Sequence, residues 1–342
     1  MLLSICIPTF NRLNCLNNCL NSILIASQNY NFNFEVCVSD NFSEGDVESI
    51  INIYKNKLDI NYKKNNKNLG HGNNILKVVS MAKGDYVWIL GNDDLILSNT
   101  LEKLHEIIQL NNDVDLFFIN SFNLSSKAVF KLPQPFHTSN LPRDMVRFSK
   151  RKLSGKLKFF DLIDPKISFD FLMGIYLVVF RRTKWEENTG VIDKKSINDS
   201  RTFSTFENTC PHLKILSRAF SKSDAYFQAE PLSVNLSGER EWWNNLYTFV
   251  ETIRMPEALD FYKSDGLSKF KFFYCKNYAL RNFIPSYFKM FLKRDVSGFQ
   301  YINFNSHILK NLIYPNVYLS VIYFVFRKIK KFFTKNLIKI NS

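Results

Sequence analysis

The chain has 342 residues, 46% of them hydrophobic, and carries a formal net charge of +14. This length and apolar fraction exclude an intrinsically disordered chain and allow one large domain or two ordinary ones. The charge favours anionic partners, namely nucleotide phosphates, nucleic acid or an acidic membrane surface, without choosing among them. With 33 phenylalanines and 15 tyrosines, some rings are expected to face a membrane or a sugar instead of a core.

The six cysteines form no C-x-x-C pair, and Cys6 and Cys37 fall inside apolar segments. We therefore expect free thiols in a reducing, cytoplasmic setting and not a disulfide framework. The chain runs directly into an apolar segment without a preceding basic region, so we expect no signal peptide. No run of 18 uncharged apolar residues occurs, so no spanning helix is expected.

Short apolar runs alternate with amphipathic segments over the first 120 residues. The runs at 2–7, 34–39, 60–63, 84–90 and 114–119 predict strands. Apolar residues recur at helical spacing within 13–24, 47–58, 75–79 and 101–108. This alternation predicts βαβ units around a mostly parallel sheet, which is an α/β fold.

The stretch from Gly84 to Asp94 carries the clearest chemical signal. Its strand is apolar almost throughout, which is typical of a strand buried on both faces, and it ends in Gly91-Asn92-Asp93-Asp94. Carboxylates at the carboxyl end of such a strand lie where open α/β sheets bind ligands. Their mutual repulsion is commonly offset by a divalent cation that carries a diphosphate. The alternative is that both carboxylates only cap the following helix.

The alternation ends after residue 120. Residues 123–158 hold three prolines and many basic residues, which predicts a long loop or an acceptor-side insertion. Further strands are predicted at 175–180 and at 229–236, the latter with Pro231 near its start. From Glu241 onward the pattern is helical, aromatic and basic.

The C-terminal tail is apolar from Val317 to Phe326, too short a run to span a membrane. Lysines and arginines then alternate with apolar residues, and no acidic residue occurs from Arg327 onward. A basic amphipathic helix of this kind lies in a membrane interface and is attracted to anionic lipid. The alternative is a core-packing helix with a solvated basic face.

Four motifs occur in order: IPTFNR at 7–12, SDN at 39–41, NLG at 68–70, and AKGDY with LGNDD within 82–94. Together they resemble family 2 glycosyltransferases of the GT-A fold, over about the first 120 residues. The details are most similar to the abequosyltransferase-type branch, which builds bacterial O-antigen and related surface polysaccharides. The resemblance implies a GT-A domain at 1–238, with a nucleotide-sugar part at 1–120 and an acceptor part at 121–238. A helical, basic, membrane-associating extension would follow at 239–342.

The resemblance also implies roles for individual residues. Those implied to bind the nucleotide sugar are Pro8, Thr9, Asn11, Arg12, Asp40, Asn68, Gly70, Asn74, Asn92 and Arg240. For Asp40 the alternative is an Asx turn. Asp93 and Asp94 match the metal-binding acids of the family and imply Mg²⁺ or Mn²⁺. The first acid of the family's D-x-D motif is replaced here by Gly91, which should weaken metal binding.

The implied reaction is attack of an acceptor hydroxyl on the anomeric carbon, with inversion and departure of a nucleoside diphosphate. A carboxylate would take the hydroxyl proton. Glu207 and Asp199 are the candidates, and Glu207 is preferred because Glu-Asn resembles the family's Glu-Asp pair. The alternative for Glu207 is a solvated side chain, and His212 either contacts a phosphate or the acceptor or is structural.

We therefore expect a glycosyltransferase of O-antigen, lipopolysaccharide or capsule biosynthesis that uses a nucleotide sugar and a lipid-linked oligosaccharide. It would be cytoplasmic and peripheral on the inner face of the membrane, held at the anionic membrane surface. One alternative, kept open by Gly91, is a catalytically silent GT-A domain acting as a membrane scaffold. A nucleic-acid-binding protein is a weaker alternative, because no nucleic-acid-binding motif occurs and nucleic acid is not an expected partner.

Overall fold

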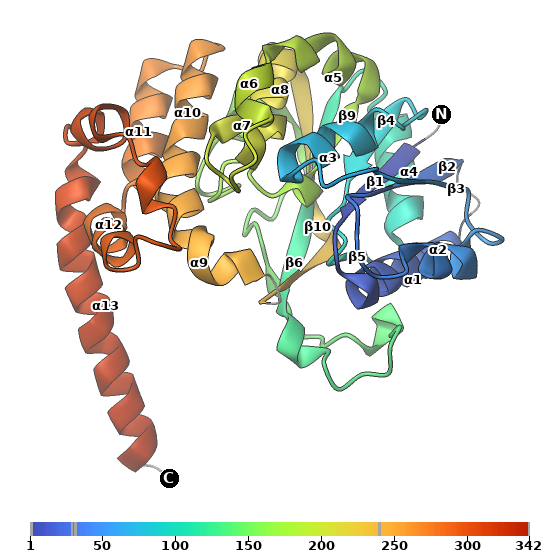
Figure 1. The fold of residues 1–342 in the computed structure, drawn as a ribbon, viewed down its shortest axis with the longest axis horizontal. Coiled ribbons are helices and arrows are strands. Elements are labelled where there is room, and N and C mark those ends of the chain that lie inside the picture. The colour runs from blue at the N-terminus through green and yellow to red at the C-terminus, as the bar shows by residue number, and fades with distance from the viewer. Residues whose placement is uncertain (1–2, 29, 31–32, 239–240, 341–342) are drawn as a thin grey trace. The chain divides into compact units, whose positions relative to one another are not determined.

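The computed structural model describes residues 3–28, 30, 33–238 and 241–340, with only the backbone at 241–244 and 331–340 (Figure 1). The chain forms two compact units, residues 1–240 and 241–342. Each unit has its own helices.

The first unit is built on one mixed sheet. Its strands are β1 (Leu3–Thr9), β2 (Phe34–Asp40), β3 (Ile60–Lys64), β4 (Tyr86–Ile89), β5 (Asp94–Ile96), β6 (Leu116–Ser125), β7 (Val146–Arg147), β8 (Gly155–Lys158), β9 (Val178–Arg181) and β10 (Asp224–Ser237). Its helices are α1 (Leu13–Gln28), α2 (Val47–Tyr54), α3 (His71–Val79), α4 (Thr100–Leu110), α5 (Arg182–Asn188), α6 (Lys194–Ile197), α7 (Phe206–Thr209) and α8 (Pro211–Phe220).

The strand order is β3-β2-β1-β4-β9-β6-β10-β5, with β7 beside β6 and β8 beside β10. Strands β3, β2, β1 and β4 are parallel neighbours, whereas β9 is antiparallel to both β4 and β6. The chain passes from β1 outward to β2 and β3 and then returns to the other side of β1 as β4. This reversal is a topological switch point, and the carboxyl ends of β1 and β4 therefore lie at the edge where open α/β sheets bind ligands.

Helices cover both faces of this sheet (Figure 1). Helix α1 packs against α2 and α4, whereas α3 packs against α7 and α8, and α5 packs against α8. Strands β1, β2 and β4 are buried almost completely because helices cover them on both sides. The predicted α/β fold with a mostly parallel core is confirmed.

Some boundaries differ from the prediction. The segment Ile175–Leu177 is a 3-10 helix, η4, so the strand predicted at 175–180 begins only at Val178. Strand β10 is longer than predicted and contains Pro231 at a shift in its register with β6, between Gln228 and Ser233. A bulge tolerates proline because the ladder is interrupted there. Strand β5 was not predicted, since it is only three residues long.

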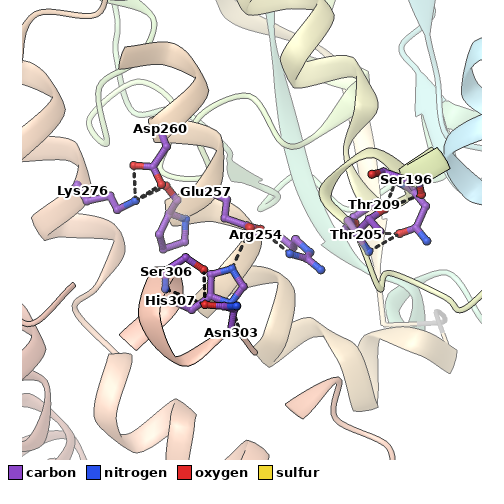
Figure 2. Close-up of polar contacts among 12 residues, drawn as sticks. Ser196, Thr205, Thr209, Arg254, Glu257, Asp260, Lys276, Asn303, Ser306 and His307 are labelled. Atoms are coloured by element: carbon purple, nitrogen blue, oxygen red, sulfur yellow. Dashed lines mark hydrogen bonds and ion pairs between the residues drawn. The ribbon is translucent and has the colours of Figure 1, made fainter. Parts of the chain in front are cut away.

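The second unit is helical. It contains α9 (Glu241–Phe249), α10 (Met255–Ser264), α11 (Lys269–Ala279), α12 (Phe283–Leu292) and α13 (Pro315–Ile340), with π-helical turns η6 at Val250–Arg254 and η8 at Phe304–Ile308. Figure 2 shows how hydrogen bonds and ion pairs connect these elements: Glu257 lies between Arg254 and His307, and Lys276 binds Asp260.

Within the described residues, no single helix is both long and apolar enough to cross a membrane. Only a bent pair, Phe304–Asn311 with Pro315–Lys330, meets the criteria of length and composition together.

Candidate active site at the carboxyl edge of the sheet

Four of the predicted residues meet at the carboxyl ends of β1, β2 and β4. Thr9 and Asp40 are register partners at the ends of β1 and β2. Asn92, just after β4, donates from Nδ2 to Thr9 Oγ1 at 2.8 Å. Asp93 follows Asn92 directly, so the side chains that the motifs single out are gathered at the switch point.

Asp40 is fully buried at this edge. Its Oδ1 accepts a hydrogen bond from the backbone N–H of Ser43 at 2.9 Å, and its Oδ2 accepts one from the Tyr62 hydroxyl at 3.3 Å. Burial, followed by the charge of Asp40, raises the pKa of Tyr62, so this phenol stays a donor at neutral pH. The bond from Ser43 spans three residues and not the two of an Asx turn, and together with the Tyr62 bond it fixes the carboxylate at the end of β2.

The loop before α3 is held by side-chain amides. Asn68 Oδ1 accepts from Asn41 Nδ2 and from the backbone N–H of Gly70, both at 2.8 Å. Gly70 is exposed and has φ +83°, a left-handed conformation that favours glycine. It precedes the first turn of α3, whose backbone N–H groups suit an anion.

Asn74 ties α3 to β2. It is buried, its Oδ1 accepts from Ser39 Oγ at 2.7 Å, and its Nδ2 donates to the Ser39 carbonyl at 3.1 Å. These bonds use both ends of the amide for positioning the loop. Asn11 is likewise used at the rim, where its Oδ1 accepts from the Glu44 N–H at 2.9 Å. Pro8 is only partly buried beside it.

Asp93 forms an ion pair with Arg12, with Arg12 Nη1 at 3.3 Å from Asp93 Oδ2. The Arg12 side chain is 22% exposed and that of Asp93 8%, so the pair is largely buried with the guanidinium on its more exposed side. The guanidinium thereby places a positive charge beside Asp93, where a diphosphate would need one.

Asp94 closes the turn after β4. Its Oδ2 accepts from the Gly91 N–H at 2.9 Å, and its Oδ1 accepts from Asn235 Nδ2 at 2.6 Å. A Cβ at position 91 would lie 2.6 Å from Asp94 Oδ2. A side chain at position 91, where the family's D-x-D motif has its first acid, would therefore have to displace the carboxylates of Asp94 and Asp93.

These carboxylates create a negative potential. Burial, then the charges of Asp94 and Asp93, raise the pKa of the Cys19 thiol in α1. Among the residues that the structure describes, no group of three or more His, Cys, Asp or Glu side chains is arranged to hold a metal ion. Asp93 is the less buried of the two carboxylates, and it would fit Mg²⁺ only if substrate phosphates and water completed the coordination.

Glu207 lies in α7, against the first turn of α3. A Cβ on Gly72 would be 2.6 Å from the Glu207 carbonyl oxygen, so only glycine allows this approach. The α7 turn is capped by Thr205, whose Oγ1 also donates to the Ser196 carbonyl at 2.8 Å (Figure 2). The Glu207 side chain is buried, and its Oε1 is 2.6 Å from Lys214 Nζ. Glu207 is therefore not a solvated side chain.

The other carboxylate candidate has a different environment. Asp199 is bound by the neighbouring Arg201, with Arg201 Nη2 at 2.6 Å from Asp199 Oδ2. The hydrogen bonds from Arg201 lower the pKa of Asp199, which makes it a weak proton acceptor.

His212 is buried in α8, and its Nε2 lies 3.2 Å from the Met173 carbonyl. Burial lowers the pKa of His212 to about 3, so the ring is neutral at physiological pH. These contacts favour a structural role for His212 over contact with a phosphate or the acceptor. Arg240, predicted to meet the diphosphate, lies outside the described residues.

The sequence did not indicate Asn235, Tyr62 or Lys214. Asn235 and Tyr62 reach the site through strand pairing across the sheet, for which the sequence holds no local signal. Lys214 follows Glu207 by seven residues and is brought back by the turn between α7 and α8.

Comparison with known proteins identifies what this chain is similar to. The model of glycosyl transferase family 2 matches residues 4–171. The chain is 40% identical over 118 residues to the abequosyltransferase RfbV of Salmonella typhimurium. The aligned segment covers 34% of this chain and 35% of that protein. It is 36% identical over 105 residues to the GalNAc(5)-diNAcBac-PP-undecaprenol beta-1,3-glucosyltransferase of Campylobacter jejuni, covering 30% of this chain and 33% of that protein.

The chain therefore spans about a third of the length of these two curated relatives. Among solved structures, it is similar to S. aureus TarS 1-349 in complex with UDP, with a TM-score of 0.55 and 15% identity. That similarity covers 82% of this chain and 71% of TarS 1-349, and it confirms the GT-A-like fold. Residues 4–171, which include the ends of β1, β2 and β4, are therefore identified as belonging to glycosyl transferase family 2.

Proposed function

We propose that this protein transfers a sugar from a nucleoside diphosphate sugar to a hydroxyl of a carbohydrate acceptor. The observation that carries the proposal is the meeting of Thr9, Asp40, Asn92 and Asp93 at the topological switch point. In this arrangement the nucleoside lies near Asp40 and the diphosphate near Arg12 and the first turn of α3. Arg12 is suited to the diphosphate because its forked donors match phosphate oxygens.

Glu207 is the proposed base. The acceptor oxygen forms a bond to the anomeric carbon while the bond from that carbon to the diphosphate oxygen breaks, and the acceptor proton passes to Glu207. Lys214, at 2.6 Å, holds this carboxylate in place. Attack from the side opposite the leaving group inverts the anomeric centre. A divalent cation bound beside Asp93 would neutralise charge on the departing diphosphate.

We further propose that the acceptor is a lipid-linked oligosaccharide and that the protein works at the cytoplasmic membrane in surface-polysaccharide synthesis. The Campylobacter relative is named for an undecaprenol-linked substrate, and the Salmonella relative for abequose transfer. The chain itself supplies a suitable surface in α13, which continues past α12 within the second unit (Figure 1).

Helix α13 exposes many apolar side chains, and every residue from 321 to 330 is exposed. Ser320 is buried and its hydroxyl accepts from the Ile284 N–H at 3.2 Å, whereas Ile322, about 200° further around the helix, is exposed. The exposed residues Leu319, Ile322, Phe326 and Ile329 follow one another at helical spacing. After Asp295 the sequence holds no acidic residue but seven lysines and arginines, so an anionic bilayer complements this face.

Sedimentation with vesicles tests the membrane proposal. Full-length protein should bind phosphatidylglycerol vesicles and not phosphatidylcholine vesicles, and the double variant Ile322→Asp/Phe326→Asp should lose binding. Leu110→Asp is the matched control, since Leu110 is an 82% exposed apolar residue at the end of α4. Equal binding by all three proteins would contradict the proposal.

Turnover tests the enzymatic proposal. Released nucleoside diphosphate should be measured with UDP-, GDP-, CDP- and dTDP-sugars and undecaprenyl-diphosphate glycans, with and without Mn²⁺. Turnover of one donor, lost in Asp93→Asn, is the expected result. If no donor is consumed, the alternative of a catalytically silent membrane scaffold replaces the enzymatic proposal.

A further inference from the structure

The turn from Ser168 to Gly174 is fixed by one carboxylate. Asp170 Oδ1 accepts from Ser168 Oγ at 2.6 Å and from the Leu172 N–H at 3.2 Å, and Oδ2 accepts from the Gly174 N–H at 3.0 Å. Burial raises the pKa of Asp170, although these bonds favour its charged form. The three hydrogen bonds to the Asp170 carboxylate therefore fix the backbone of this turn.

The turn is also strained. Phe171 has φ +53° and Leu172 has φ +73°, values that bulky residues rarely adopt. Both side chains are fully buried and anchor the turn in the core. Strained backbone persists only where the surrounding structure enforces it, and such positions cluster at ligand sites.

The result of this geometry is an outward-facing aromatic ring. Phe169, inside the turn, is 37% exposed. One face of its ring stacks on Phe148, with centroids 4.7 Å apart and planes at 27°. Phe148 is in turn buried against the edge of Tyr176 at 6.2 Å. Since Phe148 covers one face of Phe169, the exposed area lies on the remainder of the ring.

The turn that carries this ring, together with η4 directly after it, contacts both β4 and α8. The Tyr176 carbonyl accepts from Trp88 Nε1 at 2.8 Å, and Trp88 is in β4, the strand that leads to Asp93. The Met173 carbonyl of the same turn is bound by His212 in α8, which begins shortly after Glu207. The turn therefore connects the strand of the metal-side carboxylate to the helices that carry the candidate base.

We propose that Phe169 is the platform on which a sugar ring of the acceptor stacks. The turn leads into β9, which lies on the side of β4 away from β1 and β2, where the nucleoside is proposed to lie. A ring at this position meets the acceptor and not the nucleoside. The electron-rich face of Phe169 attracts the polarised C–H groups of one face of a sugar. This inference rests on the proposed function of the same site.

Saturation-transfer NMR tests it without turnover. The probes are the methyl glycosides of glucose, galactose, mannose and rhamnose, each measured in the presence of UDP. Wild type should transfer saturation to ring protons of one face of at least one glycoside. Phe169→Ala should lose this signal and Phe169→Tyr should keep it, whereas Phe130→Ala, which removes an 80% exposed ring elsewhere in the unit, should leave it unchanged.

With an active donor, Phe169→Ala should raise the acceptor KM about tenfold, the size expected for one aromatic contact, while donor hydrolysis without acceptor stays the same. The same ring-proton signal in Phe169→Ala, or no signal in wild type, overturns the proposal. Melting curves of the variants exclude unfolding as the cause. Nucleotide binding measured separately distinguishes failure of this inference from failure of the proposed function.

Discussion

Asp94 occupies the space in which a side chain at position 91 would lie: its Oδ2 accepts from the Gly91 N–H at 2.9 Å and would be 2.6 Å from a Cβ there. The absence of an acid at the first position of the D-x-D motif therefore goes together with the position of the Asp94 carboxylate, which fills that space. The site depends on Asp93 and Arg12 for its charge balance, and this leads to the following predictions.

Gly91→Ala should destabilise the protein by about 1–3 kcal/mol, because the added methyl group displaces the Asp94 carboxylate from the turn. Urea unfolding measures the change. Gly190→Ala is the control, since a Cβ at Gly190 meets nothing within 4 Å. Equal stability of the two variants would contradict the role given to Asp94.

Arg12→Ala should weaken binding of the nucleoside diphosphate and strengthen binding of Mn²⁺, because Arg12 and a metal ion compete for Asp93. Calorimetric titration of each ligand measures both effects. Arg147→Ala removes an exposed arginine that pairs with Glu230 and should change neither. Loss of both affinities in Arg12→Ala would show that Arg12 and the metal ion do not compete.

Glu207→Gln should lower the transfer rate by about 10²–10⁴-fold, the usual contribution of a positioned base, with nucleotide affinity unchanged. Asp199→Asn should retain most of the rate, because the pKa of Asp199 is lowered by Arg201. A larger loss of rate in Asp199→Asn than in Glu207→Gln would show that Asp199 is the base.

Stability should fall as the pH is lowered from about 6.5 toward 3. The pKa of His212 is lowered to about 3 in the folded protein, whereas an unfolded histidine titrates near 6.5, so the unfolded state binds more protons within this window. Urea unfolding at pH 7 and pH 5 measures the loss. His212→Gln should reduce the difference between the two pH values, and the same change at the exposed His137 should not.

Local signals sufficed for the strands that frame the site. Polar residues follow the apolar runs of β1, β2 and β4 and mark where these strands end. The three strands were therefore predicted to within a few residues. Glu207 was predicted from the resemblance, and its contact with Lys214 depends on how α7 and α8 pack.

The remaining features depend on contacts distant in sequence. Asn235 meets Asp94 across 141 residues, through the pairing of β10 with β5. The left-handed conformations of Phe171 and Leu172 contradict what their residue types favour, so only the tertiary structure determines them. Pro231 falls within a strand because the register shift there needs no donor from it.

The central claim is that a nucleoside diphosphate binds at the carboxyl ends of β1, β2 and β4. Its most direct test is the melting temperature of the protein with UDP, GDP, CDP and dTDP, each with and without Mn²⁺. A ligand that binds only the folded state raises this temperature. We expect one diphosphate to raise it in wild type, with a smaller rise in Asp40→Asn and in Asp93→Asn. An unchanged melting temperature with all four diphosphates would contradict the claim.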